Sequence, residues 1–511
     1  MQRITSTTAQ PLFGAQATRA IEHTAAAHLP AHTLMQRAGQ ATARLARALA
    51  PHARTIWVAC GSGNNGGDGL EAAALLHASG QHVVLTCLAH DPQQLPADAR
   101  ASWQRALQAG LPLLEAPPAL GAQDLCIDAL LGLGLSPAPR SRPDAHLLRH
   151  LAAVQASAAP VLCVDLPSGL LASSGQYAPG LAPQSPIISA RHTLALLTLK
   201  PGLFTAQGRD AAGQVWFDDL GVQAPQTAPD AWLGAAPAPI ARSHASHKGS
   251  FGDVAIVGGE GLAQRGMGMT GAALLAASAA LHAGAGRVLV SLLPGKDESQ
   301  IEAQALTSLQ PECMLRRFEA LALDGLTIVA GCGGGVAVAG VLAPIVQRAA
   351  RLVLDADALN AIATDRQLAR LLHERGAHAP GSTVLTPHPL EAARLLDSST
   401  EAVQADRLGA ASELAARFAC TVVLKGSGSV IAAPGRVPLI NASGNALLAT
   451  AGTGDVLAGL LGARLAGRAL QADAAFEAAA AACWQHGATA DAWPAGRALT
   501  ALALAQALTP G

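Results

Sequence analysis

Short apolar segments that each end in a glycine-rich or acidic loop recur along the whole chain. Residues 55–60, 161–164, 327–330 and 421–424 have this form, and a helical apolar pattern follows several of the loops. Short apolar runs are typical of strands buried on both faces of a parallel sheet, and helices connect such strands. The pattern therefore predicts an α/β fold in which ligands bind at the carboxyl ends of the strands.

Length and composition predict more than one domain. At 511 residues the chain exceeds one ordinary domain, and between residues 223 and 240 prolines interrupt an alanine-rich stretch. Such a stretch is typical of a linker. We predict an N-terminal Rossmann-like three-layer αβα domain over residues 1–225, a linker over 226–240, and a C-terminal αβα domain over 241–511.

Charge and cysteine usage narrow the class of protein. The formal net charge of −1 provides no basic surface for nucleic acid, and the eight cysteines form no C-x-x-C pair. Cysteines inside apolar runs act as small hydrophobic residues, which suits a reducing compartment. We expect a cytoplasmic protein with no nucleic-acid or membrane partner, and a homo-oligomer.

Two stretches without formal charge, Gly266 to Gly286 and Gly325 to Gln347, resemble membrane spans in length. Alanine and glycine dominate both stretches, and Pro344 interrupts the second. Buried strand-loop-helix units explain them better. The first residues, Met1 to Ser6, also lack the apolar segment of a signal peptide.

The loop at residues 61–69 follows an apolar strand at 55–60 and precedes a helical pattern that starts at Leu70. It holds five glycines with two asparagines and an aspartate, whereas a dinucleotide-binding G-x-G-x-x-G loop needs mainly backbone N–H groups. An oxygen-rich loop also suits a hard cation. An ordinary Asn-Gly turn would not need so many glycines.

Two further strand ends carry aspartates. Asp128 precedes a glycine turn, and Asp165 precedes Pro167 and Ser168. A lone aspartate at a strand end is usually a turn former. Three such strand ends would meet at one edge of a parallel sheet, so a composite site is the better interpretation.

In the second half, Gly452 to Asp455 opens a helical pattern, and Lys425 to Ser429 follows an apolar strand. Glycines let a backbone approach a ligand closely, and a helix N-terminus favours an anion. An aspartate in a first helical turn is also a common helix starter. The second glycine-rich loop, which follows a clear strand, favours a phosphate site over a simple helix start.

The motifs of the first half are similar to those of the NAD(P)H-hydrate epimerase family, and Lys200 to Leu203 matches that family's tail. The resemblance implies that Asp165 is the acid–base residue and that Asn65, Asp128 and Ser168 hold a potassium ion. Their oxygen ligands alone do not choose potassium over magnesium. The substrate-binding residues that it implies are Asn64, Asn65, Gly66, Gly67, Asp68, Gly132, Leu133, Gly134, Leu135, Ser136, Pro137, Ala138 and Asp165.

The loop at 132–138 departs from that family in one respect. Relatives often place a basic residue directly after the Gly-x-Gly-Leu segment, whereas Ser136 and Pro137 stand there in this chain. Arg140 follows a little later. The cationic group that faces the substrate is therefore open at this stage.

The second half resembles the ribokinase-like superfamily and, within it, the NAD(P)H-hydrate dehydratase family. The matching segments run in order through residues 248–249, 355–360, 386–389, 425–426 and 452–455, with Cys332 where proline is usual and Leu390 where glycine is usual. The resemblance implies a ribokinase-like αβα domain with Asp455 as base. It places Ala273, Gly333, His388 and Asp455 on the hydrated dinucleotide, and Lys425, Gly426, Ser427, Gly428, Ser429 and Gly454 on the adenine nucleotide.

Together the two resemblances imply a bifunctional repair enzyme for hydrated NADH and NADPH. The N-terminal domain would interconvert the R and S epimers, and the C-terminal domain would dehydrate the S epimer at the expense of ADP, releasing AMP and phosphate. Potassium and magnesium are the implied ions. Two alternatives remain. The chain could be a ribokinase-type small-molecule kinase fused to a dinucleotide-binding module, or its N-terminal domain could serve only as a dinucleotide-binding or protein-interaction module without catalysis.

Overall fold

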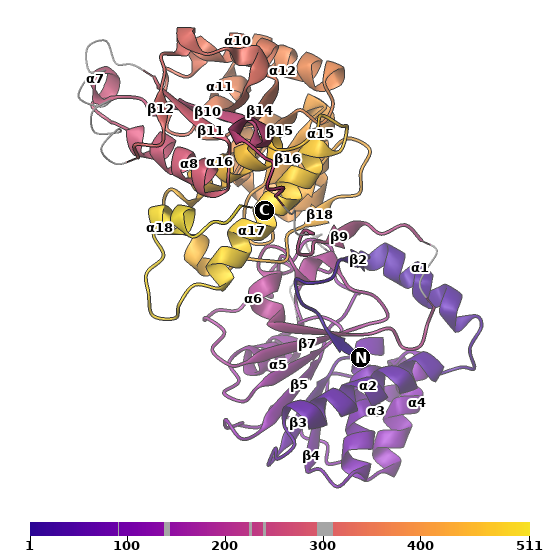
Figure 1. Ribbon diagram of the computed structural model, residues 1–511. Coiled ribbons are helices and arrows are strands. Elements are labelled where there is room, and N and C mark those ends of the chain that lie inside the picture. The colour runs from indigo at the N-terminus through magenta and orange to yellow at the C-terminus, as the bar shows by residue number, and fades with distance from the viewer. Residues whose placement is uncertain (90, 137–143, 224–226, 239–241, 294–309, 511) are drawn as a thin grey trace. The chain divides into compact units, whose positions relative to one another are not determined.

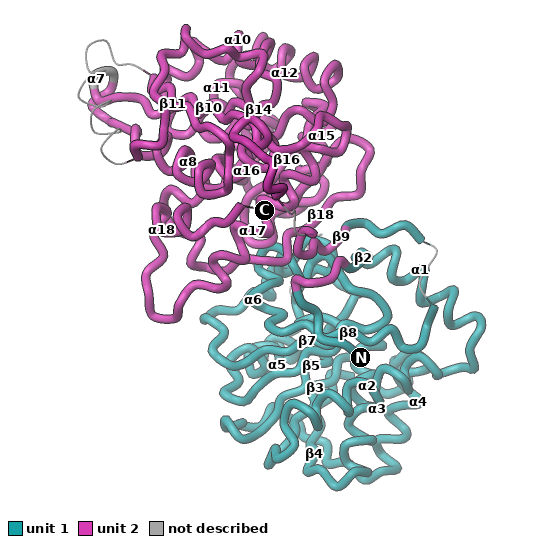
Figure 2. The backbone as a smooth tube through the Cα atoms, in the orientation of Figure 1, with its two compact units in different colours: residues 1–5, 10–231 teal, residues 6–9, 232–511 magenta. Residues whose placement is uncertain are grey.

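The computed structural model describes residues 1–511 apart from residues 90, 137–143, 224–226, 239–241, 294–309 and 511 (Figure 1). The chain forms two compact units. Unit 1 comprises Met1–Thr5 and Gln10–Ala231, and unit 2 comprises Ser6–Ala9 and Trp232–Gly511 (Figure 2).

Unit 1 is built on a sheet with the strand order β1-β8-β7-β6-β5-β3-β4. The pairings from β8 to β4 are parallel, and β1 pairs with β8 in the antiparallel direction. The strands of the unit are β1 (Gln2–Arg3), β2 (Gln10–Leu12), β3 (Ile56–Cys60), β4 (Val83–Cys87), β5 (Leu125–Ala129), β6 (Val161–Val164), β7 (Arg191–Leu196) and β8 (Gln214–Asp218). The helices are α1 (Ala15–Ala26), α2 (Thr33–Leu49), α3 (Asn64–Ala78), α4 (Ala97–Gln108), α5 (Ala145–Gln155) and α6 (Gly208–Ala212).

Alternate residues of β3 pack into two separate cores. Ile56 and Val58 belong to a cluster that includes residues of α2, α3 and α4. Trp57 and Ala59 belong to a second cluster with Leu151 of α5. Because successive side chains of a strand point to opposite faces of the sheet, these two clusters are the two helix-sheet interfaces of a three-layer αβα unit.

In unit 2 the strands run in the order β12-β11-β10-β13-β14-β15-β16-β17-β18-β9. The pairings from β12 to β16 are parallel, and β17 is antiparallel to both of its neighbours. The strands are β9 (Ala231–Leu233), β10 (Asp253–Gly258), β11 (Arg287–Leu292), β12 (Met314–Leu315), β13 (Thr327–Ala330), β14 (Arg351–Leu354), β15 (Thr383–Leu385), β16 (Thr421–Leu424), β17 (Val430–Ala432) and β18 (Leu439–Ile440).

The helices of unit 2 cover both faces of its sheet. Val254 and Ile256 of β10 pack with residues of α8, α16 and α17. Ala255 and Val257 pack with residues of α10, α11 and α15 on the other face. The helices are α7 (Leu262–Arg265), α8 (Thr270–His282), α10 (Ala339–Arg348), α11 (Ala356–Thr364), α12 (Arg366–His378), α13 (Pro389–Leu396), α14 (Thr400–Ala405), α15 (Arg407–Phe418), α16 (Thr453–Ala466), α17 (Ala474–Asp491) and α18 (Ala501–Gln506).

These observations confirm the expected fold class of two three-layer α/β domains. The predicted strands at 161–164, 327–330 and 421–424 coincide with β6, β13 and β16. The helix expected from Leu70 begins earlier, at Asn64. A Cβ on Gly66 would lie 2.0 Å from the Gly61 carbonyl oxygen, and one on Gly67 would lie 2.6 Å from Met35. Close packing thus makes a glycine-rich helical turn favourable, although glycine by itself disfavours a helix.

The stretch predicted as a linker contains a short strand. Within residues 226–240, β9 pairs in parallel with β18. The backbone carbonyl of Ser6 accepts hydrogen bonds from Ala236 N at 2.9 Å and from Trp484 Nε1 at 3.3 Å. Residues Ser6–Ala9 therefore belong to unit 2, far from the rest of it in sequence.

The cysteines and the uncharged stretches behave as the composition indicated. All eight cysteines lie among the described residues as free thiols, and seven of them are buried. Alanine-rich α8 and α10 occupy the two uncharged stretches as parts of the core. No helix within the described residues is long and apolar enough to cross a membrane.

Each unit has its own cores, so we expect the two units to fold separately. A fragment of residues 10–231 and a fragment of residues 232–511 should each be soluble and unfold cooperatively. The second should melt at a lower temperature than unit 2 in the full chain, because it lacks the Ser6 carbonyl. Circular dichroism and calorimetry of both fragments test this. A fragment that folds only when covalently joined to the other would contradict it.

Candidate active sites

The first site forms at the carboxyl ends of four neighbouring strands in unit 1. Asn64 to Asp68 open α3 directly after β3, Asp128 lies near the end of β5, Asp165 follows β6, and Lys200 follows β7. Because β7, β6, β5 and β3 are adjacent and parallel, these residues meet along one edge of the sheet. The fold therefore brings these residues to one edge of the sheet as expected, and their role as a composite binding site stays a prediction.

Asp128 and Ser168 are buried and hydrogen-bonded to each other. The Ser168 hydroxyl donates to Asp128 Oδ1 at 2.5 Å, and Ser168 N donates to Oδ2 at 2.9 Å. Leu130 N also donates to Oδ1, at 3.3 Å. Burial nevertheless raises the pKa of the Asp128 carboxyl, although these hydrogen bonds act in the opposite direction.

Asn65 carries a buried amide group without a partner. Its Nδ2 atom has no hydrogen bond among the described residues. A Cβ on Gly132 would lie 3.1 Å from Asn65 Cβ, so the Gly132 turn packs directly on this side chain. An unsatisfied buried amide is costly, and the orientation of such an amide follows its surroundings. A rotation of the amide would direct its oxygen to this position instead.

Asp165 is held in an uncommon backbone conformation by a buried lysine. Its φ of 64° lies in the left-handed region, which non-glycine residues rarely adopt. Lys200 is fully buried, and its Nζ donates to Asp165 Oδ1, to Leu196 O at 2.8 Å and to Thr198 O at 2.9 Å. Leu196 N donates to the same carboxylate oxygen at 3.1 Å. The three donors of the ammonium group are therefore all used, and the carboxylate is fixed.

A cavity of about 240 Å³ opens beside this pair. Four of the predicted substrate-binding residues line it: Asn64, Asp68, Leu133 and Asp165. Residues that the sequence reasoning missed complete its wall, and they come from α1, α2, the turn between them and other segments: Glu22, Ala26, Leu29, Pro30, Ala31, His32, Thr33, Leu34, Met35, Ala38, Asp98, Leu196, Leu197 and Leu220.

The cavity is acidic. Burial raises the pKa of the Glu22 carboxyl, and the neighbouring charge of Asp165 raises it further. Burial also raises the pKa of Asp68 well above its ordinary value, with the charges of Asp165 and Glu22 as the next causes. Carboxyl groups this close cannot all be ionised at low cost.

The Gly132 loop contacts a basic residue from α1. Arg19 Nη2 donates to Leu133 O at 2.7 Å. Arg19 therefore lies next to the loop in which relatives often carry a basic residue. Gly134, Leu135 and Ser136 continue that loop, whereas Pro137, Ala138 and Arg140 lie outside the described residues.

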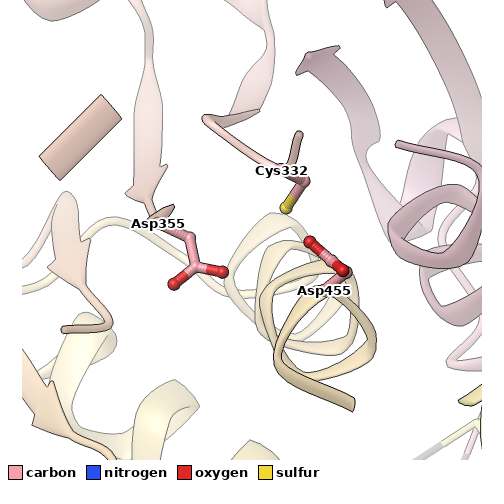
Figure 3. Close-up of side chains that lie close together, drawn as sticks. All are labelled: Cys332, Asp355 and Asp455. Carbon is pink, nitrogen blue, oxygen red and sulfur yellow. The ribbon is translucent and has the colours of Figure 1, made fainter. Parts of the chain in front are cut away.

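The second site forms at the carboxyl ends of β13, β14 and β16 in unit 2. Asp455 lies in the first turn of α16 and faces Cys332 and Asp355, which follow β13 and β14 (Figure 3). One ligand atom of each of the three residues lies within 4.8 Å of the others. Gly454, the predicted anion-binding residue, is adjacent to this cluster.

Lys425 is paired with a carboxylate in this cluster. Its Nζ lies 2.6 Å from Asp355 Oδ1, which also accepts a hydrogen bond from Thr386 Oγ1 at 2.8 Å. The backbone N of Lys425 donates to Pro387 O at 2.8 Å. A Cβ on Gly454 would lie 3.6 Å from the ammonium group, so the two predicted nucleotide-binding segments meet at this point.

The pKa of the Asp455 carboxyl is raised towards neutral pH. Burial and the neighbouring charge of Asp355 raise its pKa to about 7, whereas the Cys332 thiol and the Lys425 ammonium act to lower it. A general base works best when its pKa lies near the working pH. The geometry therefore fits a group that accepts a proton close to an anion-binding helix N-terminus.

The loop after β16 has the conformation of a tight glycine turn. Gly426 and Gly428 have φ values of 141° and 63°, which favour glycine. Buried Arg407 donates from Nη2 to Leu424 O and Lys425 O, both at 3.2 Å. Ser429 closes the turn by donating from Oγ to Gly426 O at 3.2 Å. Ser427, between the two glycines, is part of the same turn.

The three other residues predicted to contact the dinucleotide lie on different elements. Ala273 is fully buried on α8, and Gly333, with φ of 57°, follows Cys332. His388 caps α13: its Nδ1 accepts from Leu390 N at 3.1 Å, and His388 N donates to Glu391 at 2.8 Å. Burial and Lys425 lower the pKa of His388. His388 therefore has a structural role, and its role in binding stays a prediction.

The fold and the two sites define a two-domain α/β enzyme with an acid–base cluster in each unit. The family described as YjeF-related protein N-terminus matches residues 31–202, and that described as NAD(P)H-hydrate dehydratase matches residues 256–509. The bifunctional NAD(P)H-hydrate repair enzyme of Escherichia coli (strain K12) is 37% identical over 491 residues, which cover 91% of this chain and 85% of that protein.

Two further relatives with related names are also similar to this chain. The bifunctional NAD(P)H-hydrate repair enzyme of Coxiella burnetii is 33% identical over 463 residues, 87% of each chain. The ADP-dependent (S)-NAD(P)H-hydrate dehydratase of Neisseria meningitidis serogroup B is 42% identical over 257 residues, 49% of this chain and 80% of that protein. The chain belongs to the family of bifunctional NAD(P)H-hydrate repair enzymes.

The raised pKa of Asp455 predicts a pH-dependent cost to folding. Because this carboxyl ionises at lower pH when the chain is unfolded, stability should fall as pH rises from about 4 to about 7. Asp455→Asn removes the cost, so it should become more stable than the wild type across this range. Urea unfolding followed at a series of pH values measures the difference.

Two further variants control that measurement. Cys332→Ala removes a group that lowers the Asp455 pKa, so the fall in stability should continue to higher pH in this variant. Glu374→Gln, at an exposed position on α12, should leave the pH dependence unchanged. A stability difference between Asp455→Asn and wild type that does not vary with pH would contradict the raised pKa.

Proposed function

We propose that this chain repairs hydrated NADH and NADPH with two separate activities. Unit 1 interconverts the R and S epimers of the hydrate, and unit 2 dehydrates the S epimer at the expense of ADP, giving AMP and phosphate. The observation that supports this most is the pairing, in one chain, of two acid–base clusters at strand ends with a family match to each half.

In unit 2 the hydroxyl of the hydrate is a poor leaving group, whereas phosphate is a good one. Asp455 takes the proton of that hydroxyl, and the oxygen then attacks the terminal phosphate of ADP. Lys425 and the N-terminus of α16 stabilise negative charge on the transferred group. Phosphate then leaves with the bonding electrons and the adjacent ring carbon loses a proton to solvent, which restores the dihydronicotinamide. A magnesium ion would be held largely through the nucleotide phosphates and water.

In unit 1 a potassium ion is proposed at Asn65, Asp128 and Ser168. The donors fit a hard cation, because carboxylate and hydroxyl oxygens are available and a rotation of the unpartnered Asn65 amide would add an amide oxygen. The ion would neutralise the buried Asp128 carboxylate and hold the Gly132 loop in place. Asp165, fixed by Lys200, acts on the substrate as the acid–base residue.

The remaining predictions follow from the same proposal. Residues of the two loops, 64–68 and 132–138, contact the hydrated dinucleotide in unit 1, and residues 425–429 with Gly454 contact the adenine nucleotide in unit 2. The expected cytoplasmic location and homo-oligomeric state stay predictions. A ribokinase-type kinase remains the alternative, and it would accumulate a phosphorylated metabolite instead of restoring absorbance at about 340 nm.

Asp455→Asn tests the base. This variant should bind ADP normally yet dehydrate the S hydrate at least about 10²-fold more slowly, the usual contribution of a general base. Isothermal calorimetry with ADP and the recovery of dihydronicotinamide absorbance measure the two effects. Turnover close to that of the wild type would remove Asp455 from the mechanism.

Asp128→Ala tests the cation. Loss of the buried carboxylate should abolish potassium binding and epimerisation while dehydration of pure S hydrate continues at the wild-type rate. Potassium dependence of epimerisation in the wild type, with sodium as the control, provides an independent measurement. If both activities are lost together, the variant has misfolded or the two reactions share a site.

A further inference from the structure

Inversion of the hydrate requires groups on two faces of the ring. Dihydronicotinamide is an enamine, so hydration places the hydroxyl on the carbon next to the ring nitrogen. The bond between that carbon and oxygen must break and form again on the opposite face. A proton donor is needed beside the departing oxygen, and a base is needed beside the incoming water.

The carboxyl groups that line the cavity of unit 1 come from different elements. Asp68 and Asp165 both follow strands of the same sheet edge. Glu22 instead belongs to α1, which forms a helical wall with the turn at residues 29–32. Glu22 also precedes residues 31–202, to which the family match of unit 1 is confined.

The charges around the cavity assign the two roles. Lys200 donates to Asp165 and to the carbonyls of Leu196 and Thr198, so Asp165 is held in an ion pair with a buried ammonium group. Within the described residues Glu22 forms no ion pair: burial and the Asp165 charge raise its pKa, with Lys200 and Arg19 acting in the opposite direction. A pair whose surroundings differ in this way contains one acid and one base.

We propose that Glu22 is the proton donor of the epimerisation and that Asp165 is the base on the opposite face of the ring, which rests on the proposed epimerase function of unit 1. Glu22 gives its proton to the hydroxyl oxygen as the carbon–oxygen bond breaks, and the oxygen leaves as water. The lone pair of the ring nitrogen forms a carbon–nitrogen double bond, which gives an iminium cation.

The second half of the reaction reverses these steps on the other face. A water molecule adds to the iminium carbon, its electrons return to nitrogen, and its proton goes to Asp165. One inversion thus moves a proton from Glu22 to Asp165, and inversion in the opposite direction exchanges their roles. Before a second turnover in the same direction, Asp165 releases its proton to solvent and Glu22 takes one up, so the two groups return to their starting states. The acidic wall around the ring stabilises the cationic intermediate.

Substitution of Glu22 in the full-length chain tests the assignment. With a mixture of the R and S hydrates of NADH, Glu22→Gln should slow consumption of the R hydrate about 10²-fold. Dehydration of the S hydrate by unit 2 should be unchanged, which reports on folding of the variant chain. Glu22→Asp should recover part of the rate. Glu115→Gln, at an exposed glutamate of the same unit, should behave as the wild type.

Two readouts separate a proton donor from a structural residue. The epimerisation rate of the wild type should fall at high pH as Glu22 loses its proton, and this fall should be absent in Glu22→Gln. The charged groups that face Glu22 are Asp68, Asp98, Asp165, Arg19 and Lys200, with His32 in the same wall. Asp68→Asn should therefore shift the pH at which the epimerisation rate falls, without removing that fall. In water labelled with oxygen-18, each inversion should introduce one labelled oxygen.

Several outcomes would overturn the proposal. Glu22 would be removed from the reaction if Glu22→Gln epimerised at the wild-type rate. The same would follow if the high-pH fall in rate were lost in Asp68→Asn but kept in Glu22→Gln. Inversion without oxygen exchange would exclude the iminium route. If the wild type leaves the R hydrate unchanged apart from spontaneous equilibration, the proposed epimerase function itself fails, and that result is distinguishable from the others.

Discussion

Both sites depend on backbone segments that approach each other too closely to admit a side chain. A Cβ on Gly61 would lie 1.8 Å from Leu130 O, and one on Gly331 would lie 1.9 Å from Asp355 O. These contacts join the turns after neighbouring parallel strands. Without them the acidic residues at the strand ends would be separated, because each turn would need more room.

Each unit then places an ammonium group beside a carboxylate at the sheet edge, fully buried in unit 1 and partly buried in unit 2. Lys200 pairs with Asp165 in unit 1, and Lys425 pairs with Asp355 in unit 2. The chain contains only four lysines, so half of them serve in these pairs. A buried charge without a partner is strongly destabilising, and the loss of either lysine would leave one. The pairs thus hold polar side chains in fixed positions within an otherwise apolar interior.

The paired and unpaired carboxyl groups in each site differ in their surroundings. In unit 1, Asp165 is ion-paired with Lys200, whereas Glu22 is partly buried nearby and forms no ion pair with the other described residues. In unit 2, Asp355 forms the ion pair with Lys425, and Asp455 has a pKa of about 7. Each site therefore combines an ion-paired carboxylate with a carboxyl group whose pKa is raised, and in unit 2 that pKa is about 7. Such an arrangement is useful for acid–base chemistry and costs some stability.

The sequence by itself determined the α/β class, most strand positions and the residues that follow each strand, because apolar periodicity and glycine placement are local properties. It also identified Asp128, Asp165, Lys425 and Asp455 as residues of interest. It could not indicate that Glu22 on α1 lines the cavity of unit 1, because no local pattern marks that residue. The tertiary structure decided this point: burial and neighbouring charge depend on which distant segments pack together, and those are properties of the folded chain.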